Sequence, residues 1–235
     1  MNGNIKRSSL RYAFKRSIPI MIGFFPVGIA YGILMLEAGY GFLWSAGCSA
    51  IVFAGSLQML MVSFLAGGVP ILTVAVTALL LNSRHIFYGI SFIEKFRDYG
   101  PWKYFLIFSL ADENYSLLCS PNDMEGTDER LVNIYSSLLV YGYWILFSAL
   151  GGICGRFITF DTTGIDFALT ALFTVILIEQ LKGTKSKLPA VMAAVCAVLC
   201  ILIFGASNFL LPSLTATVAV LMLLRPMFEG REAAK

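Results

Sequence analysis

The sequence predicts an all-α fold, a polytopic membrane helix bundle of seven or eight transmembrane helices. Apolar residues make up 58% of the 235 residues and charged residues only 13%, and the mean hydropathy is +0.79. A soluble domain is nearer half apolar and a quarter charged, because its surface needs that polar fraction. The apolar residues also fall into long runs, many of them near the roughly 20 residues with which a helix crosses the hydrocarbon core. Soluble globular, disordered and disulfide-rich secreted proteins are therefore excluded.

Eight apolar runs are candidate membrane spans. In chain order they are residues 18–36, 42–66, 69–93, 102–120, 131–155, 164–181, 189–206 and 209–224. The first run contains Pro26, which removes a helical hydrogen bond, so we expect this first helix to be kinked or broken. The last run is short and contains Pro212, so a re-entrant segment or a hairpin of the last two runs stays open, as does a count of seven spans.

The distribution of basic residues predicts the orientation. The first run is preceded by basic residues with no acidic residue among them, as in a cytoplasmic anchor: Lys6, Arg7, Arg11, Lys15 and Arg16. A removable signal peptide is the alternative, but no small-residue cleavage site follows promptly. With eight spans and the N-terminus inside, most of the 17 Lys and Arg residues are cytoplasmic, although residues 94–103 then lie outside with several basic residues. The expected parts are a basic segment at 1–17, one transmembrane domain at 18–225 and a cytoplasmic tail at 226–235.

Small residues predict close helix packing in the bundle. Gly28 and Gly32 are four apart in the first run, and Gly151 and Gly155 are four apart in the fifth. Such spacing lets helix backbones approach closely in lipid. Pro26 together with Gly28 and Gly32 also favours an unwound stretch, whose freed backbone groups could hold a zwitterion or an ion. A simple proline kink without a ligand is the equal alternative.

Charged residues in the middle of two runs are the strongest functional signal. The third run contains Asn82, Arg84 and His85, and the fourth contains Asp112 and Glu113. A charge at mid-membrane costs at least roughly 2.5–3.5 kcal/mol. At the helical rise, Arg84 lies about 13 Å and Asp112 about 15 Å from the same side of the membrane. We therefore expect an ion pair between Arg84 and a carboxylate.

The two acidic residues cannot both face Arg84, because neighbouring residues are about 100° apart on a helix. The second carboxylate could face a cavity and carry a proton, and His85 could join a relay because imidazole titrates near neutrality. The structural alternatives are an ion pair that only joins two helices and a satisfied interior histidine. Gln58, in the second run, could bond across helices or contact a substrate.

The sequence contains no motif for catalysis or for a cofactor. It has no zinc-protease, nucleotide-binding or nucleophile-elbow pattern, and a single histidine makes a catalytic metal cluster unfavourable. Any transport is therefore passive or driven by an ion gradient. The net charge of +3 is too small to indicate nucleic-acid binding.

Four stretches resemble the AzlC family, which includes YgaZ-like proteins. They are Pro-Val-Gly-Ile-Ala-Tyr-Gly at 26–32, Phe-Ala-Gly-Ser-Leu-Gln-Met at 53–59, Asn-Ser-Arg-His at 82–85 and Ala-Asp-Glu-Asn at 111–114. The resemblance implies the large subunit of a branched-chain amino-acid exporter in the cytoplasmic membrane. It also implies a small hydrophobic AzlD-type partner subunit and coupling by proton antiport.

Together these observations predict an exporter of small apolar amino acids that works by alternating access. The expected substrate-binding residues are Pro26, Gly28, Gly32, Phe53, Gly55, Gln58, Asn82 and Arg84, and the expected proton-coupling residues are Asp112, Glu113 and His85. A non-transporting membrane scaffold that stabilises a partner is the alternative of another class, and a passive channel is a third possibility.

Overall fold

The computed structural model describes residues 3–120, 125–157, 187–205 and 209–232, and the single residues 174, 177, 178 and 181. Every regular element in those ranges is a helix, which confirms the predicted helical bundle. The helices are α1 (Gly3–Glu37), α2 (Phe42–Ile51), α3 (Gly55–Gly67), α4 (Ile71–Phe92), α5 (Trp102–Phe108), α6 (Asp112–Cys119), α7 (Glu129–Cys154), α9 (Leu188–Phe204) and α10 (Leu210–Glu232). The predicted span at 164–181 lies outside the described residues apart from isolated positions.

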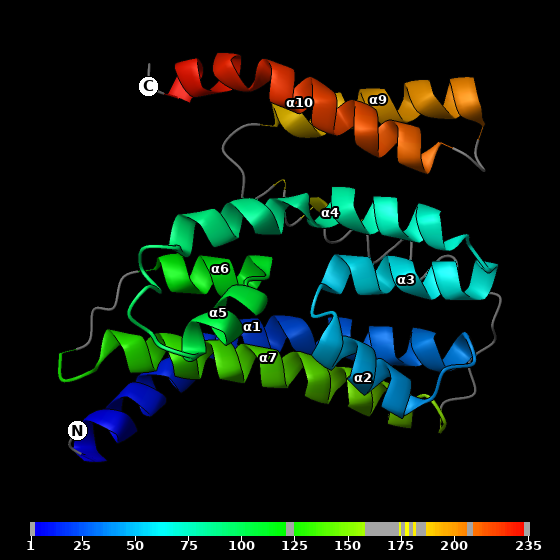
Figure 1. The fold of residues 1–235 in the computed structure, drawn as a ribbon. Coiled ribbons are helices and arrows are strands. Elements are labelled where there is room, and N and C mark those ends of the chain that lie inside the picture. Colours follow the sequence, from blue (N-terminus) through cyan, green and yellow to red (C-terminus); the bar gives the residue numbers. More distant parts are fainter. Residues whose placement is uncertain are drawn as a thin grey trace. The chain divides into compact units, whose positions relative to one another are not determined.

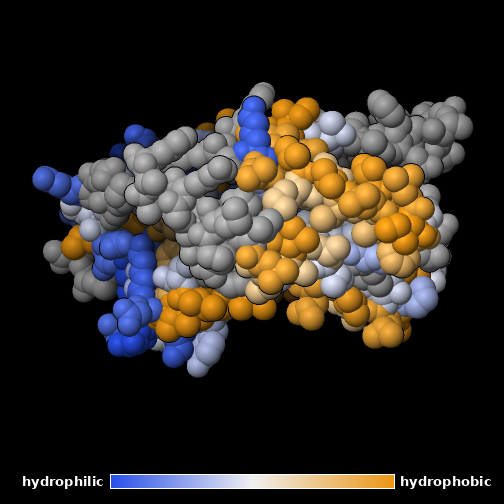
Figure 2. All heavy atoms as spheres, turned by 90° about the horizontal axis from the view of Figure 1, so that it is seen from above, coloured by the Kyte–Doolittle hydropathy of each residue, from blue (hydrophilic) through white to orange (hydrophobic). Residues whose placement is uncertain are grey.

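The described helices belong to two compact units. The first contains α1, α2, α3, the part of α4 from Ser83 onward, α5, α6 and α7; the second contains the earlier part of α4, α9 and α10, with α9 packed against α10. Among the described residues, α1, α4 and α7 are long and apolar enough to cross a membrane by length and composition. Many large hydrophobic side chains are exposed on the described helices, as Figure 2 shows for one face, which is expected of helices whose outer faces contact lipid.

The first unit is built on a parallel pair of long helices, α1 and α7, which lie side by side in Figure 1. At one end of the pair the backbone N–H of Asp128 donates to Ser9 Oγ at 3.0 Å. Further along, Gly28 lies against Phe147 and Gly32 against the backbone of Gly151. The predicted small-residue packing is therefore a close seam between these two helices.

Helix α1 continues without a break through Pro19 and Pro26, so the unwound stretch expected there is wrong. The seam with α7 extends beyond Pro26 to Gly32, and this packing supports the helix past the lost hydrogen bond. In Figure 1 the N-terminal turns of α1 run at an angle to the remainder of the helix, and a kink at Pro26 itself stays a prediction.

Two predicted spans, 42–66 and 102–120, are not single helices but pairs of shorter ones. The first pair is interrupted at residues 52–54, where Phe53 has a φ of 43°, and the second at residues 109–111. A positive φ at a bulky residue is strained and persists only where its surroundings hold it. Figure 1 shows α3 running back alongside α2, so this pair forms a hairpin.

The pair α5–α6 also returns to the end at which it starts. Lys95, which precedes α5, donates to the carbonyl oxygen of Leu118 near the end of α6 at 3.2 Å and pairs with Glu129 at 2.9 Å. Arg130 donates to the carbonyl oxygen of Tyr99 at 3.0 Å. Residues 94–103 therefore lie at the end where α7 and α1 begin, and the expectation that they lie opposite the N-terminus is wrong. The 102–120 run therefore turns back, since the residues that precede it and Leu118 near its end lie at the same end of the bundle.

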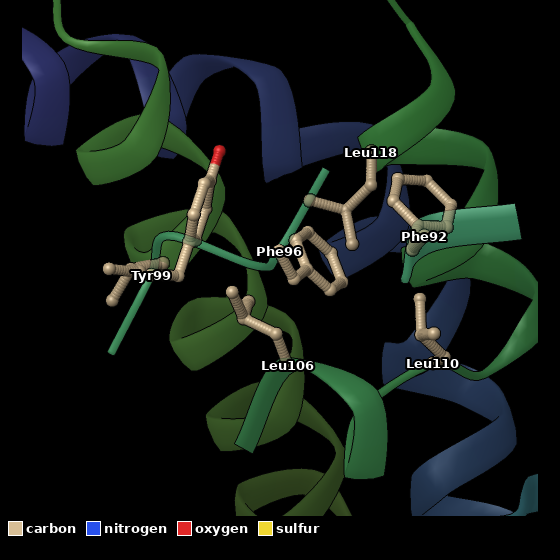
Figure 3. Close-up of a cluster of buried hydrophobic side chains, with 7 residues drawn as sticks. Phe92, Phe96, Tyr99, Leu106, Leu110 and Leu118 are labelled. Carbon is tan, nitrogen blue, oxygen red and sulfur yellow. The ribbon is translucent and has the colours of Figure 1, made fainter. Parts of the chain in front are cut away.

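A cluster of buried side chains holds this hairpin against the rest of the first unit. Phe92 ends α4, Phe96 follows it, and Leu106 and Leu118 come from α5 and α6; Figure 3 shows these rings and aliphatic groups in contact. The side chains of Phe96, Leu106 and Leu118 are almost completely buried. The connection between α4 and α5 is therefore part of the hydrophobic core, and it packs against the α5–α6 hairpin.

Candidate functional site

The centre of the first unit contains the predicted ion pair. Arg84 Nη1 lies 2.8 Å from Asp112 Oδ2, with both side chains about two-thirds buried, which confirms the pair expected from equal depth. Tyr88, one helical turn after Arg84, donates its hydroxyl to Asp112 Oδ1 at 2.7 Å. Both carboxylate oxygens of Asp112 thus have donors supplied by one face of α4.

Arg84 also joins the two hairpins. Its Nη2 atom donates to Ser56 Oγ at 3.3 Å, and Ser56 is the second residue of α3, whereas Asp112 is the first residue of α6. In Figure 1 these two helices direct their first turns toward each other. The first N–H groups of a helix lack intrahelical partners and carry a partial positive charge. The site therefore combines a guanidinium, a carboxylate and two helix N-termini in mid-bundle.

Gln58 is completely buried and forms hydrogen bonds through both its side-chain nitrogen and its side-chain oxygen, which supports the cross-helix role that the sequence left open. Its Nε2 donates to Ser49 Oγ at 3.0 Å, and its Oε1 accepts from Trp144 Nε1 at 2.9 Å and from the backbone N–H of Ala54 at 3.2 Å. Gln58 thus ties the break between α2 and α3 to α7. A contact between Gln58 and a substrate stays a prediction.

Asn114 has the same position and role at the second break, and it was not among the expected site residues. Its Nδ2 donates to the carbonyl oxygen of Ser109 at 2.8 Å and to Ser137 Oγ at 3.1 Å, and Ser137 donates back to its Oδ1 at 3.2 Å. A carboxamide in the first turn after an apolar run is the signal that could have identified it. Each hairpin therefore has an amide side chain that anchors its break to α7.

The other residues expected at the site separate into two groups. Phe53 and Gly55 lie at the break of the first hairpin, beside Ser56; the Phe53 ring is 5.1 Å from that of Tyr141. Gly28 and Gly32 instead have α7 atoms as their nearest neighbours. The structure thus brings the break residues near the ion pair and gives the two glycines of α1 a packing role.

The remaining expected residues flank Arg84 and Asp112 in the chain. The His85 ring centroid is 5.8 Å from that of Tyr88, and Asn82 Oδ1 is buried without a hydrogen-bond partner among the described residues. Glu113 is exposed and lines a groove on the side of α6 toward α1. The two acidic residues thus face different surroundings, as their angular separation predicts. The described residues contain no cluster of three metal-binding side chains.

Comparison with known proteins matches the AzlC protein family over residues 19–158. The chain is 36% identical over 227 residues to the "Branched-chain amino acid transport protein AzlC" of Bacillus subtilis (strain 168), covering 97% of this chain and 89% of the relative. It is 33% identical over 218 residues to an uncharacterized membrane protein of Helicobacter pylori (strain ATCC 700392 / 26695), covering 92% and 95%. It is 25% identical over 181 residues to the "Inner membrane protein YgaZ" of Escherichia coli (strain K12), covering 73% of each chain. No solved structure matches the chain.

Proposed function

Because this chain belongs to the AzlC protein family, we propose that it exports branched-chain and other small apolar amino acids across the cytoplasmic membrane. The proposal is supported by the name of the Bacillus subtilis relative, which is a branched-chain amino acid transport protein. The chain is a membrane protein of a transport family, and transport rather than catalysis is the activity we infer for it. The single observation that carries the mechanism is the Arg84–Asp112 pair at the junction of two helical hairpins.

In the proposed mechanism, the amino acid inserts between the two members of the ion pair. Its carboxylate binds Arg84 and the N-terminal turn of α3 at Gly55, and its ammonium group binds Asp112. Arg84 then pairs with the substrate carboxylate instead of Asp112, and Asp112 pairs with the substrate ammonium group instead of Arg84. No charge is therefore left unpaired at this depth. Phe53 contacts the aliphatic side chain of the bound molecule.

Proton coupling follows from competition at the carboxylate. A proton on Asp112 removes the charge that holds the substrate ammonium group, so proton and substrate exclude each other, which is the requirement for antiport. We propose Glu113 and His85 as the groups that relay this proton. Pro26, Gly28 and Gly32 enter the mechanism only through the α1–α7 seam. The coupling ion and the direction of export are part of the proposal.

The orientation and the partner are further parts of the proposal. The N-terminal basic segment and the basic residues Lys95, Arg97 and Arg130 gather at one end of the first unit, and we propose that this end is cytoplasmic. We also propose a small hydrophobic AzlD-type membrane subunit as the partner, without which transport is incomplete.

Amino-acid accumulation in cells tests the proposal. A strain without its own exporters is fed dipeptides that contain leucine, isoleucine or valine, and the intracellular amino acids are measured with this chain and its small partner present. We expect lower accumulation with the wild-type chain, and loss of that effect in Asp112→Asn and in Arg84→Gln. Lys95→Gln is the matched control, because it removes one member of an ion pair of similar length at the bundle end.

The same experiment separates an exporter from a scaffold. A scaffold needs the central pair only for stability, so replacing both Arg84 and Asp112 with neutral residues should restore its function. Normal export by the single variants refutes the ion-pair mechanism. Unchanged accumulation of every amino acid, with the protein verified in the membrane, refutes export of this substrate class.

A further inference from the structure

We propose that the groove between α1 and α6 is an access site in which a zwitterionic amino acid with a short apolar side chain binds before it reaches Arg84. The inference rests on the proposed transport function and extends it to residues that the sequence did not indicate. The groove has a volume of about 660 Å³ and is lined by Tyr12, Arg16, Pro19 and Ile20 of α1 and by Asp112, Glu113, Ser116, Leu117 and Ser120 nearby on the α6 side.

The polar face of α6 indicates that water fills this groove. Glu113 and Ser116 are exposed on the face toward α1, whereas Tyr115 and Leu118 on the other side pack against the buried aromatic cluster. A charged carboxylate turned toward lipid costs at least roughly 2.5–3.5 kcal/mol near mid-membrane. Intramembrane acidic residues face the bundle interior or a water-filled cavity, and because Glu113 lines the open α1–α6 groove we infer that this groove is hydrated.

The charges along the groove are arranged to orient a zwitterion. Arg16 is fixed at the far end of α6, where its guanidinium donates to the carbonyl oxygens of Leu117 and Ser120. Asp112 and Glu113 lie in the first turn of α6, whereas Leu117 and Ser120 follow Glu113 by four and seven residues, which is about 6 and 10 Å along a helix. An entering amino acid is thus drawn with its ammonium group toward Asp112 and its carboxylate toward Arg16.

The groove leads to the central site because Asp112 belongs to both. Asp112 is among the residues that line the groove, and its carboxylate pairs with Arg84. Between the charged ends, Pro19, Ile20 and Leu117 provide apolar surface for an aliphatic side chain. The volume greatly exceeds that of one leucine, as expected of a hydrated vestibule rather than a closed binding site.

Cysteine accessibility tests the proposal in the full-length chain. The native cysteines are replaced, Ser116→Cys is introduced, and its modification by a cationic and by an anionic thiosulfonate reagent is measured in membrane vesicles. We expect faster modification by the cationic reagent, and a smaller preference for it in Glu113→Gln. Leucine at ten times its dissociation constant should slow the reaction about tenfold by occupying the site.

Matched controls use the same helices. A variant that retains only Cys119, which is exposed on α6 but does not line the groove, should show no effect of leucine. Arg16→Gln should weaken protection by leucine, whereas Lys15→Gln, which removes the same charge outside the groove, should not.

The outcomes distinguish this inference from the proposed function. If Ser116→Cys is unreactive, or reacts without protection, in protein that exports leucine normally, the access site is refuted and the exporter stands. Protection by leucine that is as strong in Arg16→Gln as with Arg16 present overturns the orientation of the zwitterion. Loss of both export and protection, in a chain verified in the membrane, refutes the transport function on which the inference rests.

Discussion

A methyl group at Gly32 should destabilise the protein by forcing α1 and α7 apart. A Cβ atom added there would lie 2.5 Å from the backbone nitrogen of Gly152 and 2.8 Å from the backbone carbon of Gly151. Ordinary carbon contacts are about 3.5 Å or longer, so the helices must separate by roughly 0.7–1 Å over several turns. Because the obstructing atoms are backbone, no rotamer change relieves the clash. Overpacking of this kind costs about 1–3 kcal/mol or more.

Gly23→Ala is the matched control, since it makes the same change on the same helix with no atom within 4 Å of the added Cβ. Alanine is about 1 kcal/mol better than glycine in a helix interior, so this variant should be neutral or slightly more stable. Thermal unfolding of the purified protein in detergent measures both. A Gly32→Ala protein that melts at or above the temperature of Gly23→Ala would show that the seam is not the close backbone contact described above.

The hydrogen bonds at the two breaks and at the ion pair lead to further predictions. Gln58→Leu leaves a buried indole N–H and a backbone N–H without acceptors, and should lower thermal stability by about 1–3 kcal/mol per stranded donor. An unchanged melting temperature contradicts the anchoring role of Gln58. Asn114→Leu should similarly destabilise the second break, and proteolysis of the α5–α6 connection should accelerate; an unchanged cleavage rate contradicts the anchoring role. Tyr88→Phe removes one donor to Asp112 but leaves the aromatic packing, so export should fall more than thermal stability does, as measured by leucine accumulation and by melting in parallel.

The central ion pair could be predicted from the sequence because it depends on local regularities. Helical rise fixes the depth of Arg84 and Asp112 relative to the same end of their runs, and the cost of an unpaired charge in lipid selects the pairing. The structure has the pair at 2.8 Å, although Asp112 begins a helix rather than lying inside one. The depth estimated for Asp112 is still correct, because the α5–α6 hairpin begins and ends at the same end of the bundle and its turn, just before Asp112, lies in mid-bundle.

The hairpins could not be predicted, because hydropathy measures only how apolar a run is. Residues 42–66 and 102–120 are long enough to cross a bilayer, and the second break at residues 109–111 contains neither proline nor glycine. Each break is held by long-range hydrogen bonds instead: the Trp144 indole N–H donates to Gln58, and Asn114 donates to Ser137. Such partners are separated by many residues, so no window of sequence contains them.

The chain by itself determined its class as a helical membrane protein, the seam glycines and the depth of its charges, because composition and helical periodicity act over a few turns. Only the tertiary structure decided which runs turn back, that Arg84 joins the first turns of α3 and α6, and that Glu113 faces a groove rather than the ion pair. These features depend on which helices become neighbours. That choice is made by the packing of α1 and α2 on α7 and by buried polar groups that must find partners in an apolar bundle.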